Sequence, residues 1–224
     1  MYTPPDYPQR PYFPRRYSES EVLHRSTYFR SDMEHRRSVR QFSDKPVPLQ
    51  VIENIMMTAA TAPSGANKQP WTFCAISDPN IKKEVRIAAE KEETEFYTHR
   101  ATEDWLKDLE PFGTNSEKPF LEVAPWLIVM FRQVHGLAKD GSKIGHYYVN
   151  ESNGIAAGIL ISAIHHAGLV TLTHTPSPMN FLQKILNRPD HERPYLLLPV
   201  GYAAPDVMVP DISRKPVNDV ISYY

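Results

Sequence analysis

A short basic run near residue 40 contains the side chains in this sequence that are best suited to bind an anion. The run consists of Arg36, Arg37, Ser38, Val39 and Arg40. Guanidinium groups donate charge-assisted hydrogen bonds to phosphate oxygens, and a serine hydroxyl can add another. Basic clusters are also common on solvated surfaces. The run by itself therefore leaves a phosphate site and an ordinary surface patch as alternatives.

Motifs for several other chemistries are absent from the sequence. It has no GxGxxG turn, P-loop, CxxC pair or HExxH helix, and no nucleophile turn of the hydrolase type. The nine histidines do not follow the spacing of metal ligands, and the consecutive His165 and His166 would point in different directions on a helix. We therefore predict neither a metal site nor a hydrolase.

The composition is that of one globular domain of ordinary charge. The 224 residues suffice for a substantial core, and 25 Lys and Arg against 26 Asp and Glu leave a formal net charge of -1. This balance gives no general attraction to nucleic acid or anionic lipid. No apolar run reaches the about 20 residues of a membrane helix, and the single cysteine, Cys74, reads as a small buried side chain in a reducing compartment. We expect a cytoplasmic protein without a membrane anchor.

Hydrophobic periodicity predicts an α+β protein in which helices and strands mix along the chain. Helices are expected at 48–63, 81–100, 147–167 and about 181–186, and strands at 71–76, 126–131, 169–173 and 195–200. Gly154 and Gly158 share one side of the third helix, which permits a close helix approach in the core or across a dimer interface.

Two terminal arms and a lid complete the predicted organisation. Residues 1–30 are rich in proline and tyrosine and are expected to form an extended arm, followed by one domain over 31–224 whose last part, about 203–224, is a second arm. The helix that begins near Ile81 is charged and has few large apolar side chains. It can bury only a thin stripe, so we expect a mobile lid over about 81–118.

The order of several motifs resembles the nitroreductase superfamily, and within it the iodotyrosine deiodinase family. The resemblance covers residues 36–217 and rests on the basic run together with 61–67, 69–73, 133–136, 146–148, 167–171 and 198–202. It implies an α-β sandwich with a central mixed sheet surrounded by helices, a homodimer whose active site lies at the subunit interface, and flavin mononucleotide (FMN) as cofactor.

The resemblance also implies roles for individual residues. Residues that match FMN-binding positions are Arg36, Arg37, Ser38, Val39, Arg40, Pro63, Ser64, Thr173, His174, Thr175 and Arg214. Thr175 matches the catalytic residue that hydrogen-bonds flavin N5 and favours one-electron flavin steps. Residues that match substrate-binding positions are Ala66, whose N–H would hold the phenolate oxygen, and Glu93, Tyr97 and Lys118, which would hold the amino acid part.

Elementary chemistry agrees with those substrate roles. Glu93 and Tyr97 are four residues apart and share one helix face, and Lys118 arrives from the following loop. A zwitterion needs both signs of charge, so Lys118 and Tyr97 suit its carboxylate and Glu93 suits its ammonium group. The alternative is a solvated helix face for Glu93 and a structural strand-end residue for Thr175.

The activity implied by the resemblance is FMN-dependent reductive dehalogenation. Mono- and diiodotyrosine would give tyrosine and iodide, and bromo- and chlorotyrosine are expected to react as well. The reductant would be NAD(P)H, acting directly or through a separate reductase. Two alternatives remain open: a general NAD(P)H-dependent nitroreductase, and a flavin- or amino-acid-binding protein without turnover.

Overall fold

The chain divides into two compact units. In the computed structural model, residues 8–224 are described, and the units are residues up to His35 and residues 36–224. The first unit contains the helix α1 (Glu19–His35), which buries none of its side chains. The second unit, which we call the body, contains every other helix and strand.

The prediction of an extended arm is wrong for residues 19–30, which belong to α1. The helix starts where the prolines end, because Ser18 and Glu21 form a capping box. The N–H of Ser18 donates to the Glu21 carboxylate at 3.1 Å, and the N–H of Glu21 donates to the Ser18 hydroxyl at 3.3 Å. Residues 8–18 contain no helix or strand, as expected, and residues 1–7 lie outside the described residues.

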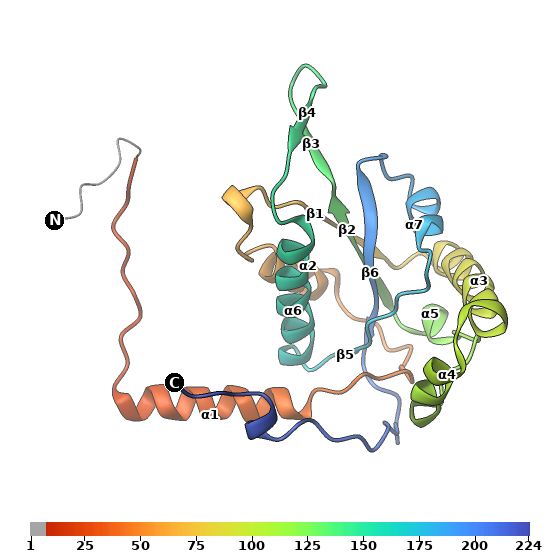
Figure 1. Ribbon diagram of the computed structural model, residues 1–224, viewed down its shortest axis with the longest axis horizontal. Coiled ribbons are helices and arrows are strands. Elements are labelled where there is room, and N and C mark those ends of the chain that lie inside the picture. The colour runs from red at the N-terminus through yellow and green to blue at the C-terminus, as the bar shows by residue number, and fades with distance from the viewer. Residues whose placement is uncertain (1–7) are drawn as a thin grey trace. The chain divides into compact units, whose positions relative to one another are not determined.

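A four-stranded sheet forms the centre of the body (Figure 1). Its order is β1, β2, β6, β5, with bounds β1 (Trp71–Ile76), β2 (Trp126–Gln133), β6 (Glu192–Gly201) and β5 (Val170–Thr171). These strands pair antiparallel, and a bridge from Ser38 to Thr171 adds a parallel contact, which makes the sheet mixed. All four strands were predicted, although β5 is shorter and β2 and β6 are longer than expected.

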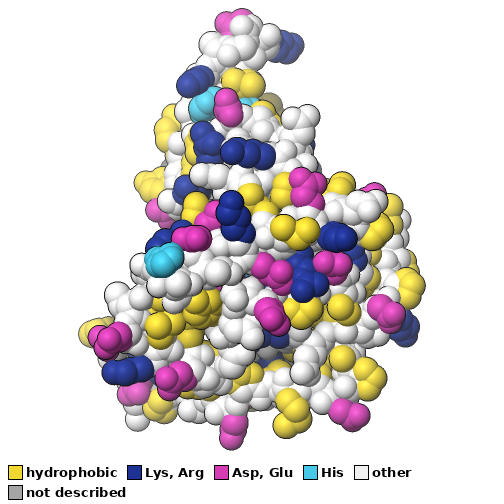
Figure 2. Space-filling view, turned by 90° about the vertical axis from the view of Figure 1, so that its right-hand side faces the viewer, with side chains coloured by type: hydrophobic (Ala, Val, Ile, Leu, Met, Phe, Trp, Pro, Cys, Tyr) yellow, Lys and Arg dark blue, Asp and Glu magenta, His cyan; other side chains and the backbone are white. Residues whose placement is uncertain are grey.

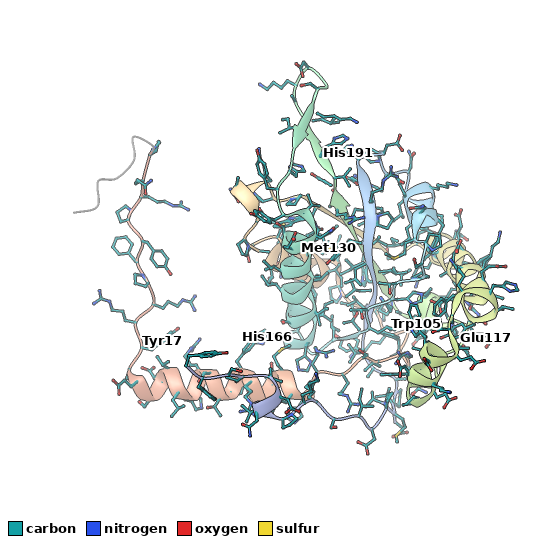
Figure 3. All side chains as sticks on the ribbon, viewed as in Figure 1. Tyr17, Trp105, Glu117, Met130, His166 and His191 are labelled. Atoms are coloured by element: carbon teal, nitrogen blue, oxygen red, sulfur yellow. The ribbon has the colours of Figure 1, made fainter. Side chains whose placement is uncertain are left out.

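Helices cover both faces of this sheet, so the α-β sandwich is confirmed. One apolar layer packs α2 (Leu49–Ala59) and α6 (Val149–His166) on the sheet, and Met130, labelled in Figure 3, lies within it. A second layer packs α3 (Pro79–Glu95), α5 (Phe120–Val123) and α7 (Asn180–Ile185) on the opposite face. Alternating side chains of β2 supply both layers, as the period of a strand requires.

Helix α3 is as charged and as thinly buried as its sequence predicts. Asp78 caps it by accepting from the N–H groups of Asn80 and Ile81, and Pro79 occupies its first turn. Its buried residues are only Lys82, Val85 and Ala89. Figure 2, which faces this side of the body, shows acidic and basic side chains next to one another on the surface.

Short elements follow α3 and complete the segment that we predicted as a lid. They are a π-helical turn (Phe96–Arg100), α4 (Glu103–Leu109) and a 3-10 turn (Glu110–Phe112). The remaining elements are a 3-10 turn (Gly65–Asn67), the hairpin of β3 (His135–Leu137) and β4 (Lys143–Gly145), and a 3-10 turn (Val217–Asp219) within an otherwise irregular C-terminal segment. Among the described residues, no helix is long and apolar enough to cross a membrane.

The glycine side of α6 is open rather than packed in the core. Gly154 and Gly158 are both exposed, whereas Ala156, Ala157 and Leu160 are buried. Gly168 follows the end of the helix with a φ of +75°, the left-handed conformation that is common there. Of the two alternatives for the glycines, packing in the core of the body is therefore excluded.

Candidate functional site

The basic run lies beside the C-terminal segment and forms a small cavity with it. The cavity has a volume of about 170 Å³ and is lined by Arg36, Arg37, Ser38, Arg40, Phe112, Pro210, Ile212, Ser213 and Arg214. The sheet holds the run in place, since the N–H of Val39 donates to the carbonyl of Thr171 at 3.1 Å and the Val39 side chain is buried. The run is therefore part of the fold and not a free surface patch.

The electrostatics of this cavity favour an anion. Burial lowers the pKa of the Arg36 guanidinium, and the nearby charges of Arg214 and Arg37 lower it further. Arg214 donates to the carbonyl of Arg36 at 3.0 Å, and Arg37 donates to the carbonyl of Pro210. No carboxylate lines the cavity. A phosphate bound among these guanidiniums would offset their mutual repulsion.

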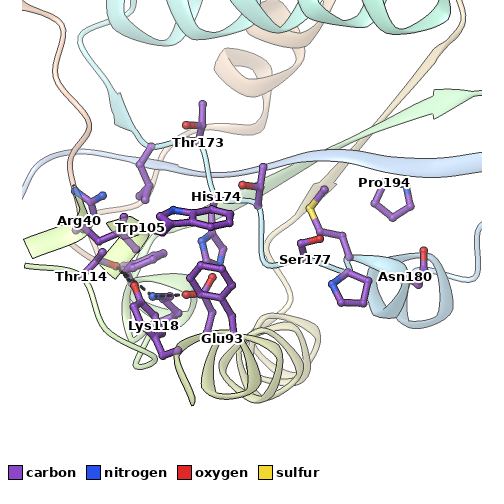
Figure 4. A pocket seen from close by; sticks show the side chains of 18 of the residues that line it. Arg40, Glu93, Trp105, Thr114, Lys118, Thr173, His174, Ser177, Asn180 and Pro194 are labelled. Atoms are coloured by element: carbon purple, nitrogen blue, oxygen red, sulfur yellow. Dashed lines mark hydrogen bonds and ion pairs between the residues drawn. The ribbon is translucent and has the colours of Figure 1, made fainter. Parts of the chain in front are cut away.

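A larger pocket of about 830 Å³ lies on the side of the sheet that α3, α5 and α7 cover, and Arg40 lines both cavities. Figure 4 shows its side chains arriving from α3, α4, the loop before α5 and the segment after β5. Of the predicted site residues, it brings together Arg40, Glu93, Tyr97, Lys118, Thr173, His174 and Thr175.

Glu93 and Lys118 form a buried ion pair in this pocket. The Lys118 Nζ and Glu93 Oε2 atoms are 3.1 Å apart, and the two side chains are only 3% and 14% exposed (Figure 4). Burial lowers the pKa of the Lys118 ammonium, while the charge of Glu93 acts in the opposite direction. Lys118 also donates to the Asn115 carbonyl and, at 3.4 Å, to the Thr114 hydroxyl. The solvated-face alternative for Glu93 is thus excluded.

Tyr97 joins the same group of side chains through Thr114. Its hydroxyl donates to Thr114 Oγ1 at 3.2 Å, and its ring lies 5.7 Å from the Lys118 ammonium. Burial raises the pKa of the Tyr97 phenol, so the hydroxyl stays protonated and remains a donor at neutral pH. The π-helical turn that contains Tyr97 is a kind of irregularity that often occurs at functional sites.

An aromatic wall, which the sequence reasoning missed, closes one side of the pocket. Phe96 and Trp105 pack edge to face with ring centroids 4.8 Å apart, and Leu109 and Phe120 line the pocket with them. Trp105 is labelled in Figures 3 and 4. Trp105 is 53% exposed although it is a large aromatic residue. The signal in the sequence that could have indicated this wall is Trp105, a tryptophan within a strongly charged segment.

Thr173, His174 and Thr175 reach the pocket where the chain leaves β5. His174 is anchored by two backbone hydrogen bonds with Leu197, at 2.9 and 3.2 Å. Burial lowers the pKa of its imidazole to about 3, and the charges of Lys118 and Arg40 contribute to this shift. The ring is therefore neutral at pH 7, and its buried Nε2 atom has no hydrogen-bond partner within the described residues.

Four predicted site residues line neither cavity: Val39, Pro63, Ser64 and Ala66. Val39 belongs to the core, whereas Ala66 is exposed on the turn between α2 and β1. Ala66 has a φ of 48°, and no acceptor for its N–H is found among the described residues. Gly65 is required before it, because a Cβ there would meet the Tyr147 carbonyl at 2.8 Å. Within residues 8–224, no group of side chains suits a metal ion.

Comparison with known proteins places the chain in a family. Residues 33–202 match the model of the nitroreductase family. The chain therefore belongs to the nitroreductase family.

The chain is also similar to individual proteins with more specific names than that of the family. The chain is 58% identical to "Iodotyrosine deiodinase" of Haliscomenobacter hydrossis over 96% of each chain. It is 44% identical to "Iodotyrosine deiodinase 1" of Homo sapiens, over 94% of this chain and 73% of that one. A solved structure of oxidized iodotyrosine deiodinase bound to FMN and 3-iodo-L-tyrosine has a TM-score of 0.75 and 29% identity, and covers 88% of this chain and 98% of that chain.

Proposed function

We propose that this protein binds FMN and reductively dehalogenates halotyrosines, releasing tyrosine and halide. The observation that supports this best is the union of two features through Arg40: an anion cavity, and a pocket with a buried pair of opposite charges. The first suits a phosphate and the second suits an amino acid zwitterion. The relatives named iodotyrosine deiodinase, similar over nearly the whole chain, agree with this reading.

In this proposal the chain binds both the phosphate and the isoalloxazine ring of FMN. Arg36, Arg37, Ser38 and Arg214 bind the phosphate, and Thr173 to Thr175 contact the isoalloxazine ring. Bound FMN supplies the electrons for the reduction. The Thr175 hydroxyl would donate a hydrogen bond to flavin N5, and this contact would favour one-electron flavin steps. The unpartnered Nε2 atom of His174 is available for a polar contact in the same pocket.

The substrate zwitterion would exchange one set of ionic contacts for another. Lys118 and Tyr97 bind the carboxylate, and Glu93 binds the ammonium group, so that both buried charges keep an opposite partner. The aromatic wall of Phe96 and Trp105 covers the bound ring. Substrate binding thereby orders the charged segment 81–118, which closes as a lid and excludes water.

A second copy of the chain would complete the site. Pro63, Ser64 and Ala66 line neither cavity of their own chain, and the N–H of Ala66 has no acceptor among the described residues. In the homodimer that we propose, these residues contact the flavin and the phenolate of the other subunit. The exposed glycine side of α6, with Ile155 46% exposed, supplies an apolar surface for that contact.

The electron source and the compartment are also part of the proposal. NAD(P)H provides the electrons, either directly or through a separate reductase. We place the protein in the cytoplasm, because its single cysteine, Cys74, is half-buried and forms no disulfide.

One experiment tests the activity. The purified flavoprotein is reduced anaerobically, iodotyrosine is added, and flavin reoxidation is followed together with iodide release. We expect about one iodide per reduced flavin, because removal of one halogen consumes two electrons. Reoxidation by a nitroaromatic compound but not by iodotyrosine would support a general nitroreductase instead. No reoxidation by either compound would support a binding protein without turnover.

A further inference from the structure

The loop before α5 places one threonine hydroxyl between two groups of the proposed substrate site. Thr114 Oγ1 accepts a hydrogen bond from the Tyr97 hydroxyl at 3.2 Å and another from the Lys118 ammonium at 3.4 Å. Thr114 is half-buried and lines the large pocket, where Figure 4 shows it bonded to Lys118. It is not among the site residues that the sequence predicted. A single hydroxyl therefore connects the phenol and the ammonium group that we assign to the substrate carboxylate.

Bonds at both ends of this loop fix the position of Thr114. Gly113 has a φ of +56°, which glycine adopts without strain, and its N–H donates to the Glu110 carbonyl at 3.1 Å. At the other end, the N–H of Lys118 donates to Glu90 Oε1 at 2.6 Å, and Arg86 pairs with that carboxylate at 2.7 Å. Glu90 belongs to α3, so the loop is tied to the helix that precedes Tyr97.

The ammonium group of Lys118 has three protons, and each of them has an acceptor. The acceptors are Glu93 Oε2 at 3.1 Å, the carbonyl of Asn115, and Thr114 Oγ1. A substrate carboxylate can replace Glu93 as the ionic partner of Lys118 while the other two bonds remain. Those two bonds would keep the ammonium group in place during the exchange.

We propose that Thr114 is a positioning residue that orients Tyr97 and Lys118 toward the substrate carboxylate. This inference rests on the proposed function. Without substrate, Tyr97 donates its proton to Thr114. When the carboxylate binds, the Tyr97 hydroxyl donates to the carboxylate instead and accepts the proton of Thr114. Lys118 keeps its bond to Thr114 and gains the carboxylate.

The chemistry of a hydroxyl group permits this reversal. A threonine hydroxyl has two acceptor positions and one proton to donate, so Thr114 can accept from Lys118 and donate to Tyr97 at the same time. The result is a series of hydrogen bonds from the Lys118 ammonium through Thr114 and Tyr97 to the carboxylate. Each bond in such a series polarises the next one. Valine has nearly the shape of threonine but cannot take part in this series.

The first test measures the binding of iodotyrosine to the FMN-bound protein by titration of flavin fluorescence. Thr114→Val should weaken binding about tenfold, the size of one hydrogen bond that involves a charged group. Thr114→Ala should behave in the same way, and Thr114→Ser, which keeps the hydroxyl, should bind like the wild type. Equal binding by the wild type, Thr114→Val and Thr114→Ala overturns the proposal, and so does a Thr114→Ser variant as weak as Thr114→Val.

Thr94→Val is the matched control for the loss of a threonine hydroxyl. Thr94 is exposed on α3, its hydroxyl donates to the Glu90 carbonyl at 2.8 Å, and it does not line the pocket. Thr94→Val should bind iodotyrosine like the wild type. All of these variants should retain FMN affinity. A weaker FMN affinity in Thr114→Val that matches its loss of iodotyrosine affinity would show a structural defect and refute a role specific to the substrate.

A double-mutant cycle with Tyr97→Phe tests whether Thr114 acts through Tyr97. In the Tyr97→Phe background, Thr114→Val should weaken iodotyrosine binding by less than about threefold, because the acceptor of its proton is already gone. A tenfold effect in both backgrounds refutes the proposed series of hydrogen bonds. In turnover, Thr114→Val should raise KM and leave kcat nearly unchanged, because its contacts lie at the amino acid part of the substrate and not at the reacting ring.

The two proposals fail in distinguishable ways, because the binding measurements require no turnover. If iodotyrosine binds but no iodide is released, the proposed reaction is refuted, and the double-mutant cycle still decides the role of Thr114. If iodide is released and the Thr114 variants bind iodotyrosine like the wild type, only the role of Thr114 is refuted. A wild-type protein that does not bind iodotyrosine refutes both proposals.

Discussion

Replacement of His174 by glutamine should remove a specific pH dependence of stability. In the folded chain the imidazole is 6% exposed, and burial, together with the charges of Lys118 and Arg40, lowers its pKa from 6.5 to about 3. Phe120 packs edge-on against the ring at 5.7 Å and offers no counter-charge. The folded state therefore holds His174 neutral over a pH range in which the unfolded chain binds a proton.

The sign and the size of the effect follow from this difference in pKa. Because the folded-state value is the lower one, His174 contributes stability above about pH 6.5, and this contribution is lost as the pH falls toward 3. One pKa unit corresponds to about 1.4 kcal/mol, so the full loss is on the order of 5 kcal/mol. Between pH 6 and 4, the free energy of unfolding should fall by up to about 1.4 kcal/mol per pH unit through this residue alone.

The measurement is urea denaturation of the flavin-free protein at several pH values from 7.5 to 4.5. His174→Gln cannot titrate in this range, so the difference in unfolding free energy between the wild type and this variant should shrink or reverse as the pH falls. His166→Gln, at an exposed position at the end of α6, is the matched control and should parallel the wild type. If the difference between the wild type and His174→Gln stays constant over this range, the reasoning from burial is wrong.

Four further predictions concern the proposed site. Glu93→Gln should weaken iodotyrosine binding about 10- to 100-fold, because Lys118 stays buried without its carboxylate partner and the substrate ammonium group loses its carboxylate partner too. Titration of flavin fluorescence measures this binding. Equal weakening in the exposed control Glu95→Gln would contradict the prediction. Arg214→Ala should weaken FMN binding by a similar factor, since Arg214 lines the anion cavity; the neighbouring Lys215→Ala should bind FMN normally, and normal binding by both variants would remove Arg214 from the phosphate site. Thr175→Ala should lower the rate of dehalogenation and preserve FMN binding, and an unchanged rate would reject its proposed contact with flavin N5. Proteolysis between residues 90 and 118 should slow at saturating iodotyrosine in the FMN-bound protein. An equal cleavage rate with and without iodotyrosine would refute the proposal that this segment closes as a lid.

The elements of the body could be read from local patterns because each depends on neighbours in sequence. The apolar run at Trp71–Ile76 is a strand with the predicted bounds, and α6 ends at His166, one residue before the predicted end. The error at α1 has a local cause too. The capping box of Ser18 and Glu21 was a readable signal, but the composition of the preceding proline-rich residues outweighed it in the prediction.

The sequence by itself determined which residue types could bind a phosphate and an amino acid, and family resemblance assigned them roles. Only the tertiary structure decided which of them meet. The cavity of Arg36 and Arg214 joins residues 178 positions apart. The buried ion pair of Glu93 and Lys118 joins α3 to the loop before α5. The low pKa of His174 likewise depends on burial, which no local pattern reports. Contacts of this kind follow from strand pairing and packing between distant segments, and local propensity carries no information about them.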